Sequence, residues 1–477
     1  MSTPSVLLGP IVGGLSHNRA NIWARADSPS TLHIWLAAHA DLSDTQLIGQ
    51  VELLPEDGCA GIVSLERLEP EKKYYYAVSL RNVRPAQNDF HSFTTFPEPR
   101  TPRSFSFAFG SCYLPPDERG GETMDELNRR IEPEDLRFGL FLGDQIYADR
   151  ADLNGIGQIA VTLDEYRAVY EYAWRRPVMR ALLPSLPLFM TLDDHEVDDD
   201  WRWLDSEHSA AAISAFERFF RWLKGLPSEQ RRLSPERVHA ALKAYHEHQA
   251  IHAPGGFLPL ETNPIGESRS QSQDTVSFAY AFYLGGAAFF VLDTRTMRVK
   301  DGKRSMLGEA QWTLLQEWLK EANSQYPIKF LVSSATILHP FWLDLTRDRW
   351  NGFPVERERL LEFLAVNEIE GLHILTGDLH SAHAVSAELK CPGGRRIPIW
   401  EFCSTPFEQS ARLAAITYRP LSSKWIGNQK RLFQQTGRNF GIIHVDFDAS
   451  TPHVTFTLHY DQNGWKIRPP IATILKT

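Results

Sequence analysis

The 477-residue sequence lacks a long hydrophobic segment, and no basic stretch precedes its first apolar residues. A membrane-spanning helix needs about 20 consecutive apolar residues, and a secretory signal begins with a positively charged region. We therefore expect no membrane span and no secretory signal, and we predict a cytoplasmic protein.

Cysteine is scarce as well. The four cysteines, Cys59, Cys112, Cys391 and Cys403, are widely spaced and form no CxxC pair. This spacing fits reduced thiols better than a disulfide framework. A buried structural thiol is the first expectation for each cysteine taken alone.

Positive charge is in deficit. Fifty Lys and Arg residues stand against 59 Asp and Glu residues, which gives a formal net charge of −9. An acidic chain argues against a surface that binds polyanions, so nucleic acid is not an expected partner. A local cationic or metal site could still hold a phosphate group.

Apolar and aromatic residues are plentiful, at 43% and 11% of the chain. The length exceeds one ordinary core and suggests about two or three domains. Residues 1–97 carry short β-branched and aromatic runs separated by turns, which predicts a small β-sandwich domain. The proline-rich stretch TTFPEPRTPRS then has the composition of a linker.

From residue 104 onward, apolar strands alternate with helical segments. The strand segments include FSFAFGSC, FGLFLGD, PLFMTLDD, AAFFVLDTR, IKFLVSSA and GLHILTGD. The helical patterns include LDEYRAVYEYAWRRPVMRALL and EAQWTLLQEWLKEA. We predict an α/β layered domain over residues 104–477, with a helical insertion at about 205–252 and a return to strands after about 395.

Four of these apolar strands end in side chains that can bind metals. They are followed by Cys112, by Asp144, by the run of Asp193, Asp194 and His195, and by Asp378 with His380. Charged groups at the ends of buried strands are unfavourable unless a cation, a hydrogen-bond network or solvent compensates them. One such end could be a simple turn, but the repetition favours a shared metal centre.

The ligand types indicate two kinds of ion. A thiolate, a phenolate and an imidazole near carboxylates could hold a ferric or other transition-metal ion, and the remaining oxygens suit a hard divalent ion such as calcium. Two such ions can clamp a phosphate, lower the pKa of a bridging water and stabilise the attacking and leaving oxygens. Asp144 would be the carboxylate between the ions.

A second histidine group, His246, His248 and His252, has a spacing that can chelate zinc. No HExxH pattern or third ligand type accompanies it. We interpret it as a surface or core-packed set, and a histidine that reaches over the substrate stays an alternative.

Seven segments follow one another in order between about residues 104 and 385. They are FGSC, GDQIYAD, LDDHEVDDDW, FFVLDTR, MLGEAQWTLLQEWL, RDRWNGFPVER and TGDLHSAH. Together they resemble the motifs of PhoD-type alkaline phosphatases, distant relatives of purple acid phosphatases in the calcineurin-like metallophosphoesterase fold. The resemblance implies an α/β metallophosphoesterase sandwich preceded by an Ig- or fibronectin-III-like β-sandwich.

The resemblance also implies a ligand set. Cys112, Asp144, Tyr147 and His380 would surround Fe(III), and Asp144 would bridge to a Ca(II) site. The residues expected to hold metal are, in full, Cys112, Asp144, Tyr147, Asp194, Asp200, Asp378 and His380. Other divalent metals could occupy these positions.

Two further residues have implied catalytic roles. His195 would contact the phosphate or protonate the leaving group. Arg295 would clamp the phosphate, because a guanidinium offers bidentate donors that an ammonium lacks.

The chain departs from the family pattern at two places. Asp199 and Asp200 stand where the family commonly shows asparagines, and their charge could tighten a cation or weaken an anionic substrate. Ser333 and Ser334 stand where purple acid phosphatases carry a histidine ligand. The second ion is then surrounded by oxygen, which favours calcium over zinc.

The implied function is that of a metal-dependent phosphoesterase, in which a metal-activated water or hydroxide attacks a small phosphorylated substrate. A non-catalytic scaffold is the alternative, in which the β-sandwich recruits a partner and the α/β domain is retained. The sequence does not choose among a monoester, a diester and a phospholipid head group. It also does not define the oligomeric state.

Overall fold

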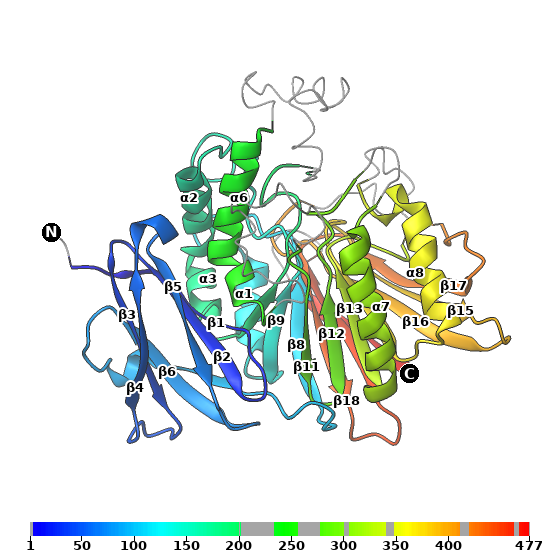
Figure 1. The fold of residues 1–477 in the computed structure, drawn as a ribbon, viewed down its shortest axis with the longest axis horizontal. Helices are drawn as coiled ribbons and strands as arrows, with labels where there is room; N and C mark the ends of the chain where they lie inside the picture. The colour runs from blue at the N-terminus through cyan, green and yellow to red at the C-terminus, as the bar shows by residue number, and fades with distance from the viewer. Residues whose placement is uncertain are drawn as a thin grey trace.

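The computed structural model describes residues 3–199, 201, 233–255, 277–299, 305–339, 348–410, 419–461 and 467–476. The described strands form four sheets, and helices lie beside the two larger ones (Figure 1). No helix in these ranges has the length and apolar character needed to cross a bilayer. All four cysteines are free thiols, as their spacing predicts.

The N-terminal strands form two antiparallel sheets. One contains β1 (Val6–Gly13), β2 (Arg19–Ala26) and β5 (Ala60–Glu66), and the other has the order β4 (Gln46–Leu53), β3 (Ser30–Ala37), β6 (Lys73–Ser79) and β7 (His91–Thr94). Side chains from both sheets, among them Ile22, Ile34 and Tyr76, are buried in one apolar core. The predicted β-sandwich is confirmed, and the division of the chain at residues 97 and 104 stays a prediction.

Two larger mixed sheets form the centre of the molecule. The six-stranded sheet has the order β10 (Leu188–Met190), β9 (Leu136–Phe141), β8 (Phe105–Gly110), β18 (Asn439–Asp446), β19 (His453–Asp461) and β20 (Ile467–Lys476). The seven-stranded sheet has the order β11 (Tyr280–Leu284), β12 (Ala287–Val291), β13 (Ile328–Ser333), β14 (Leu372–Thr376), β16 (Arg396–Cys403), β15 (Ala382–Lys390) and β17 (Ile426–Gln435). Strands β8, β9 and β10 run parallel, and so do β12, β13, β14 and β16.

Phenylalanine rings join the two central sheets. The ring of Phe107 in β8 lies 5.6 Å from Phe289 of β12 and 5.4 Å from Phe330 of β13, measured between centroids. The ring of Phe138 in β9 lies 5.7 Å from Phe289. Ala108, which lies between Phe107 and Phe109 in β8, faces the opposite side of the sheet and packs with residues of the helices. Both faces of these strands are therefore buried, which explains their continuous apolar sequence.

Helices cover the outer faces of these sheets (Figure 1). Helices α1 (Glu122–Arg130), α2 (Leu163–Trp174) and α3 (Pro177–Leu182) pack beside the six-stranded sheet, and α7 (Gly308–Gln325) and α8 (Pro354–Val366) beside the seven-stranded sheet. The helical pattern over 163–183 forms two helices rather than one. Pro177 begins the second, because proline lacks the backbone N–H that a continuous helix would use.

Helix α6 (Pro235–His248) and the turn Ala250–His252 belong to the predicted helical insertion, whose residues 205–232 lie outside the described ranges. The His248 ring stacks on Tyr170 of α2 with centroids 4.2 Å apart, and its Nδ1 lies 2.8 Å from the Ala244 carbonyl oxygen. The His252 ring packs against Trp23 of the β-sandwich. Both histidines are fully buried, so the core-packed interpretation holds for them.

A buried ion pair fastens α6 to α2. Glu247 accepts two hydrogen bonds from Arg167, at 2.8 Å from Nε and 2.7 Å from Nη2, and the two side chains are 6% and 9% exposed. Arg167 Nη2 also donates to the carbonyl oxygen of Glu56 in the sandwich, at 2.8 Å. The exposed Asp164 approaches the same guanidinium at 3.2 Å.

This geometry predicts unequal effects of two charge-neutralising substitutions. Glu247→Gln should lower the free energy of unfolding by about 2 kcal/mol, because the buried guanidinium of Arg167 loses its buried counter-charge. The amide oxygen of the new side chain would still accept one hydrogen bond. Asp164→Asn removes an exposed partner and should leave the unfolding free energy unchanged within error. Denaturant unfolding of both variants measures the difference, and equal losses would contradict it.

Candidate metal centre

The loops that follow four strands meet between the central sheets. Cys112 follows β8, Asp144 follows β9, Asp194 follows β10 and Asp378 follows β14. The carboxyl ends of parallel strands carry the binding sites of α/β sheets. Here the first three residues come from the six-stranded sheet and the fourth from the seven-stranded sheet.

Three groups of buried side chains could each hold a metal ion. Within each group, one ligand atom per residue lies within 4.8 Å of the others. The groups are Cys112 with Asp144 and His380, Asp144 with Asp194 and His195, and Asp144 with Asp193 and Asp378. Asp144 belongs to all three, which is the position expected for a bridging carboxylate.

The first group combines sulfur, oxygen and nitrogen donors. Cys112 Sγ lies 3.3 Å from Asp144 Oδ2, and Tyr147 Oη lies 3.3 Å from His380 Nε2. The hydroxyls of Ser111 and Thr405 each lie 3.2 Å from the same sulfur. Burial, reinforced by the nearby Asp378 carboxylate, raises the pKa of Cys112 to about 12. A thiolate at this position therefore requires a compensating cation.

The carboxylate groups need a cation for the same reason. Burial raises the pKa of Asp144 well above its usual range. Burial, with Asp194 and Asp378 as like-charged neighbours, raises the pKa of Asp193 to about 8, although Arg295 opposes the change. Asp193 Oδ2 is buried and has no hydrogen-bond partner in the described part of the chain. This donor set fits a hard cation bound by oxygen.

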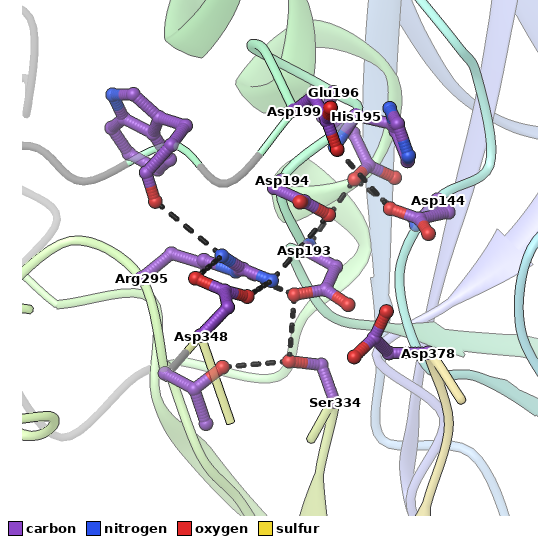
Figure 2. Close-up of polar contacts among 12 residues, drawn as sticks. Asp144, Asp193, Asp194, His195, Glu196, Asp199, Arg295, Ser334, Asp348 and Asp378 are labelled. Atoms are coloured by element: carbon purple, nitrogen blue, oxygen red, sulfur yellow. Dashed lines mark hydrogen bonds and ion pairs between the residues drawn. The ribbon is translucent and has the colours of Figure 1, made fainter. Parts of the chain in front are cut away.

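Arg295 lies among carboxylates (Figure 2). Its Nε lies 2.5 Å from Asp193 Oδ1, and its Nη2 lies 3.4 Å from Asp194 Oδ1. Asp348 pairs with the same guanidinium, with Oδ2 2.9 Å from Nη2. Ser334 donates to Asp193 Oδ1 at 3.0 Å, so the predicted serine position contacts a carboxylate of the centre. Arg295 is 0% exposed and orients the acidic side chains that surround it.

His195 is paired with Asp149. Their Nδ1 and Oδ1 atoms lie 2.8 Å apart, and the His195 ring packs against Tyr147 with centroids 4.2 Å apart. Burial alone would lower the pKa of His195, but the carboxylates of Asp149, Asp194 and Asp144 outweigh it and raise the pKa well above the usual value.

The backbone of this centre is strained. Cys112, Asp144, Asp378 and His380 all have positive φ, at 64°, 54°, 60° and 52°. Residues other than glycine adopt this left-handed region infrequently, and such strain persists only where the surroundings enforce it. Strain at four expected ligands supports a functional role for their loops.

Several side chains of the centre were not among the predicted site residues. They are Asp193, Asp149, Glu196, Arg349 and Thr405. Asp193 was named among the strand-end side chains that can bind metals but received no role, and Glu196 and Asp149 lie inside the motifs LDDHE and GDQIYAD, so a signal was present. Arg349, whose Nε lies 2.6 Å from Asp378 Oδ2, belongs to the motif RDRWNGFPVER, although nothing in that motif indicates its partner. Thr405, whose hydroxyl lies 3.2 Å from Cys112 Sγ, comes from a distant loop and belongs to none of the seven motifs. Asp200, a predicted ligand, lies outside the described residues, and its role stays a prediction.

Comparison with known proteins identifies a family that this chain matches. Residues 107–456 match the family of PhoD-like phosphatases. Alkaline phosphatase D of Bacillus subtilis (strain 168) is 25% identical over 356 residues, which are 68% of this chain and 53% of that protein. The chain thus spans about half the length of this curated relative.

Two solved structures share the fold. The structure of PhoD has a TM-score of 0.72 at 21% identity and covers 100% of this chain and 91% of that chain. The purple acid phosphatase PPD1 from yellow lupin (Lupinus luteus) seeds has a TM-score of 0.57 at 11% identity, with 98% and 74% covered. These likenesses confirm the predicted fold class, with its sandwich and its layered α/β domain.

Gly143 offers a test of how closely the loops must approach. Its φ is 91°, and a Cβ there would lie 2.4 Å from Asp193 Cβ. Gly143→Ala should lower the ratio of bound metal to protein and destabilise the fold by about 2 kcal/mol, because Asp193 must move. Gly157 has a φ of 75° but no atom within 4 Å of its added Cβ, so Gly157→Ala is the matched control. Elemental analysis and thermal unfolding of both variants measure these effects. Equal metal content in Gly143→Ala and Gly157→Ala would refute the need for a close approach at Gly143.

Proposed function

The chain belongs to the PhoD-like phosphatase family, and on that premise we propose that it is a metal-dependent phosphoesterase acting on small phosphate esters. The observation that carries this proposal is the set of three buried ligand groups that share Asp144. Buried, mutually close carboxylates are unfavourable without cations, and paired cations are suited to phosphoryl chemistry. Monoesters and diesters both fit this proposal.

We assign Fe(III) to Cys112, Asp144, Tyr147 and His380, and Ca(II) to the carboxylate groups, in which Asp194 and Asp378 face Asp144. Bound ions would acidify a water molecule and offset charge on the phosphate. The protein's part is to hold the thiolate, phenolate and imidazole on one side of Asp144 and hard oxygens on the other. Other divalent metals in these positions are compatible with the same geometry.

His195 is the proposed proton donor or phosphate contact. Because Asp149 occupies Nδ1, Nε2 is the nitrogen that would donate to a phosphate or leaving-group oxygen. Its proximity to Asp144 and Asp194 places the ring beside the carboxylate groups. A histidine held in this way serves proton transfer in many hydrolases.

The phosphate contact of Arg295 stays a prediction, and its ion pairs favour a role in holding Asp193 and Asp194. Arg349 is likewise paired with a carboxylate, that of Asp378, which favours the same role for it. The cytoplasmic location also stays a prediction.

Asp144→Asn tests the proposal directly. The variant should fold, because a large α/β core does not depend on its metal, but should bind less than the wild-type amount of metal and lose almost all activity. Circular dichroism, elemental analysis and hydrolysis of an aryl phosphate and a bis-aryl phosphate measure these three properties. Full metal content with a near wild-type rate would refute the bridging role. A wild-type protein with neither metal nor turnover would favour the non-catalytic scaffold.

A coloured iron centre is expected if Cys112 and Tyr147 both bind Fe(III). Thiolate and phenolate ligands should give visible charge-transfer absorption, and Cys112→Ser and Tyr147→Phe should each remove one component of it. Cys403→Ser is the matched control, because this buried thiol donates to the carbonyl oxygens of Gly377 and Ser381 and belongs to none of the three ligand groups. A colourless wild-type protein with full iron occupancy would contradict the ligand assignment.

A further inference from the structure

Glu196 is a fully buried carboxylate that the proposed chemistry does not use. It follows Asp194 by two residues, yet its side chain contacts backbone from two different loops. Its Oε2 accepts hydrogen bonds from the backbone N–H groups of Asp144 at 3.0 Å and Asp193 at 3.1 Å. Its Oε1 accepts from the N–H of Gln145 at 2.7 Å.

These contacts fix the two loops relative to each other. The loop after β9 carries Asp144 and the loop after β10 carries Asp193, and both N–H groups converge on one oxygen. Hydrogen bonds to a charged acceptor are shorter and stronger than neutral ones. One of them is donated by Asp144, whose backbone has the left-handed φ of 54° that residues other than glycine adopt infrequently.

The same carboxylate reaches the inserted helical segment. Gln249, directly after α6, donates from Nε2 to Glu196 Oε1 at 3.1 Å and to the hydroxyl oxygen of Tyr170 in α2 at 2.9 Å. Two acceptors around one amide nitrogen fix the orientation of the Gln249 side chain. Glu196 therefore has four donors, three from the ligand loops and one from the insertion.

We propose that Glu196 is the positioning residue of the metal centre, which holds the Asp144 and Asp193 loops at the separation that cations require, and that Gln249 makes the inserted segment part of this support. The expected effect of Glu196 on the rate of hydrolysis rests on the proposed phosphoesterase function, whereas its expected effect on metal affinity does not. Outer contacts of metal ligands commonly change metal affinity or activity by about 10- to 100-fold when removed.

The test compares Glu196→Gln and Gln249→Met with the control Glu356→Gln. Glu356 is also a buried carboxylate that accepts backbone N–H groups, from Met306 and Leu307, and neither is a candidate ligand. Calcium titration, metal content, thermal unfolding and aryl phosphate kinetics are measured for each protein. We expect Glu196→Gln to weaken calcium binding by about 10- to 100-fold, with kcat affected more than KM, and Gln249→Met to show a smaller loss in the same direction.

Added calcium should partly restore the activity of Glu196→Gln, because mass action compensates a weakened site but not a general loss of folding. The control should keep wild-type calcium affinity even if its melting temperature falls. Unchanged calcium affinity in Glu196→Gln, or an equal loss in Glu356→Gln, would overturn the proposal. If Glu196→Gln does not fold, unchanged affinity in Gln249→Met would overturn it. A wild-type protein that binds calcium without turnover would refute only the phosphoesterase function, and the affinities would still decide the role of Glu196.

Discussion

Mutual repulsion among buried carboxylates is the constraint on which the rest of this structure depends. Asp144, Asp193, Asp194 and Asp378 are brought out of water within a few residues of strand ends. Arg295 and Arg349 neutralise part of this charge through ion pairs. The remainder calls for metal ions, and the strained loops, the buried guanidiniums and the hydrogen bonds of Glu196 together keep the acidic groups from moving apart.

Much of this organisation could be predicted from the sequence because it is local. Buried central strands give uninterrupted apolar runs such as FSFAFG. Most of the candidate ligands stand within four residues of a strand end, namely Cys112, Asp144, Asp194, Asp378 and His380, and Tyr147 stands six residues after β9. Asp149 and Glu196 belong to the motifs GDQIYAD and LDDHEVDDDW, but those motifs do not indicate which groups the two carboxylates contact.

The remaining contacts depend on chain folding over long separations. Asp348 lies 53 residues from Arg295, and Asp193 lies 102 residues from it, so no local pattern pairs them. Glu196 accepts hydrogen bonds from backbone N–H groups. Every residue except proline has such a group, so the sequence cannot indicate which of them Glu196 contacts. The phosphate contact expected of Arg295 rested on the family resemblance and on the residue type, and neither distinguishes a guanidinium facing substrate from one enclosed by carboxylates.

The phenylalanine rings between the sheets have a consequence beyond packing. The centre is assembled across a seam, with Cys112, Asp144 and Asp194 on one sheet and Asp378 and His380 on the other. A shift of one sheet along the other would change the distances between the two groups of candidate ligands. Interlocked rings in a close-packed interior oppose such sliding. The aromatic layer therefore helps to keep the two halves of the candidate metal centre at a constant separation.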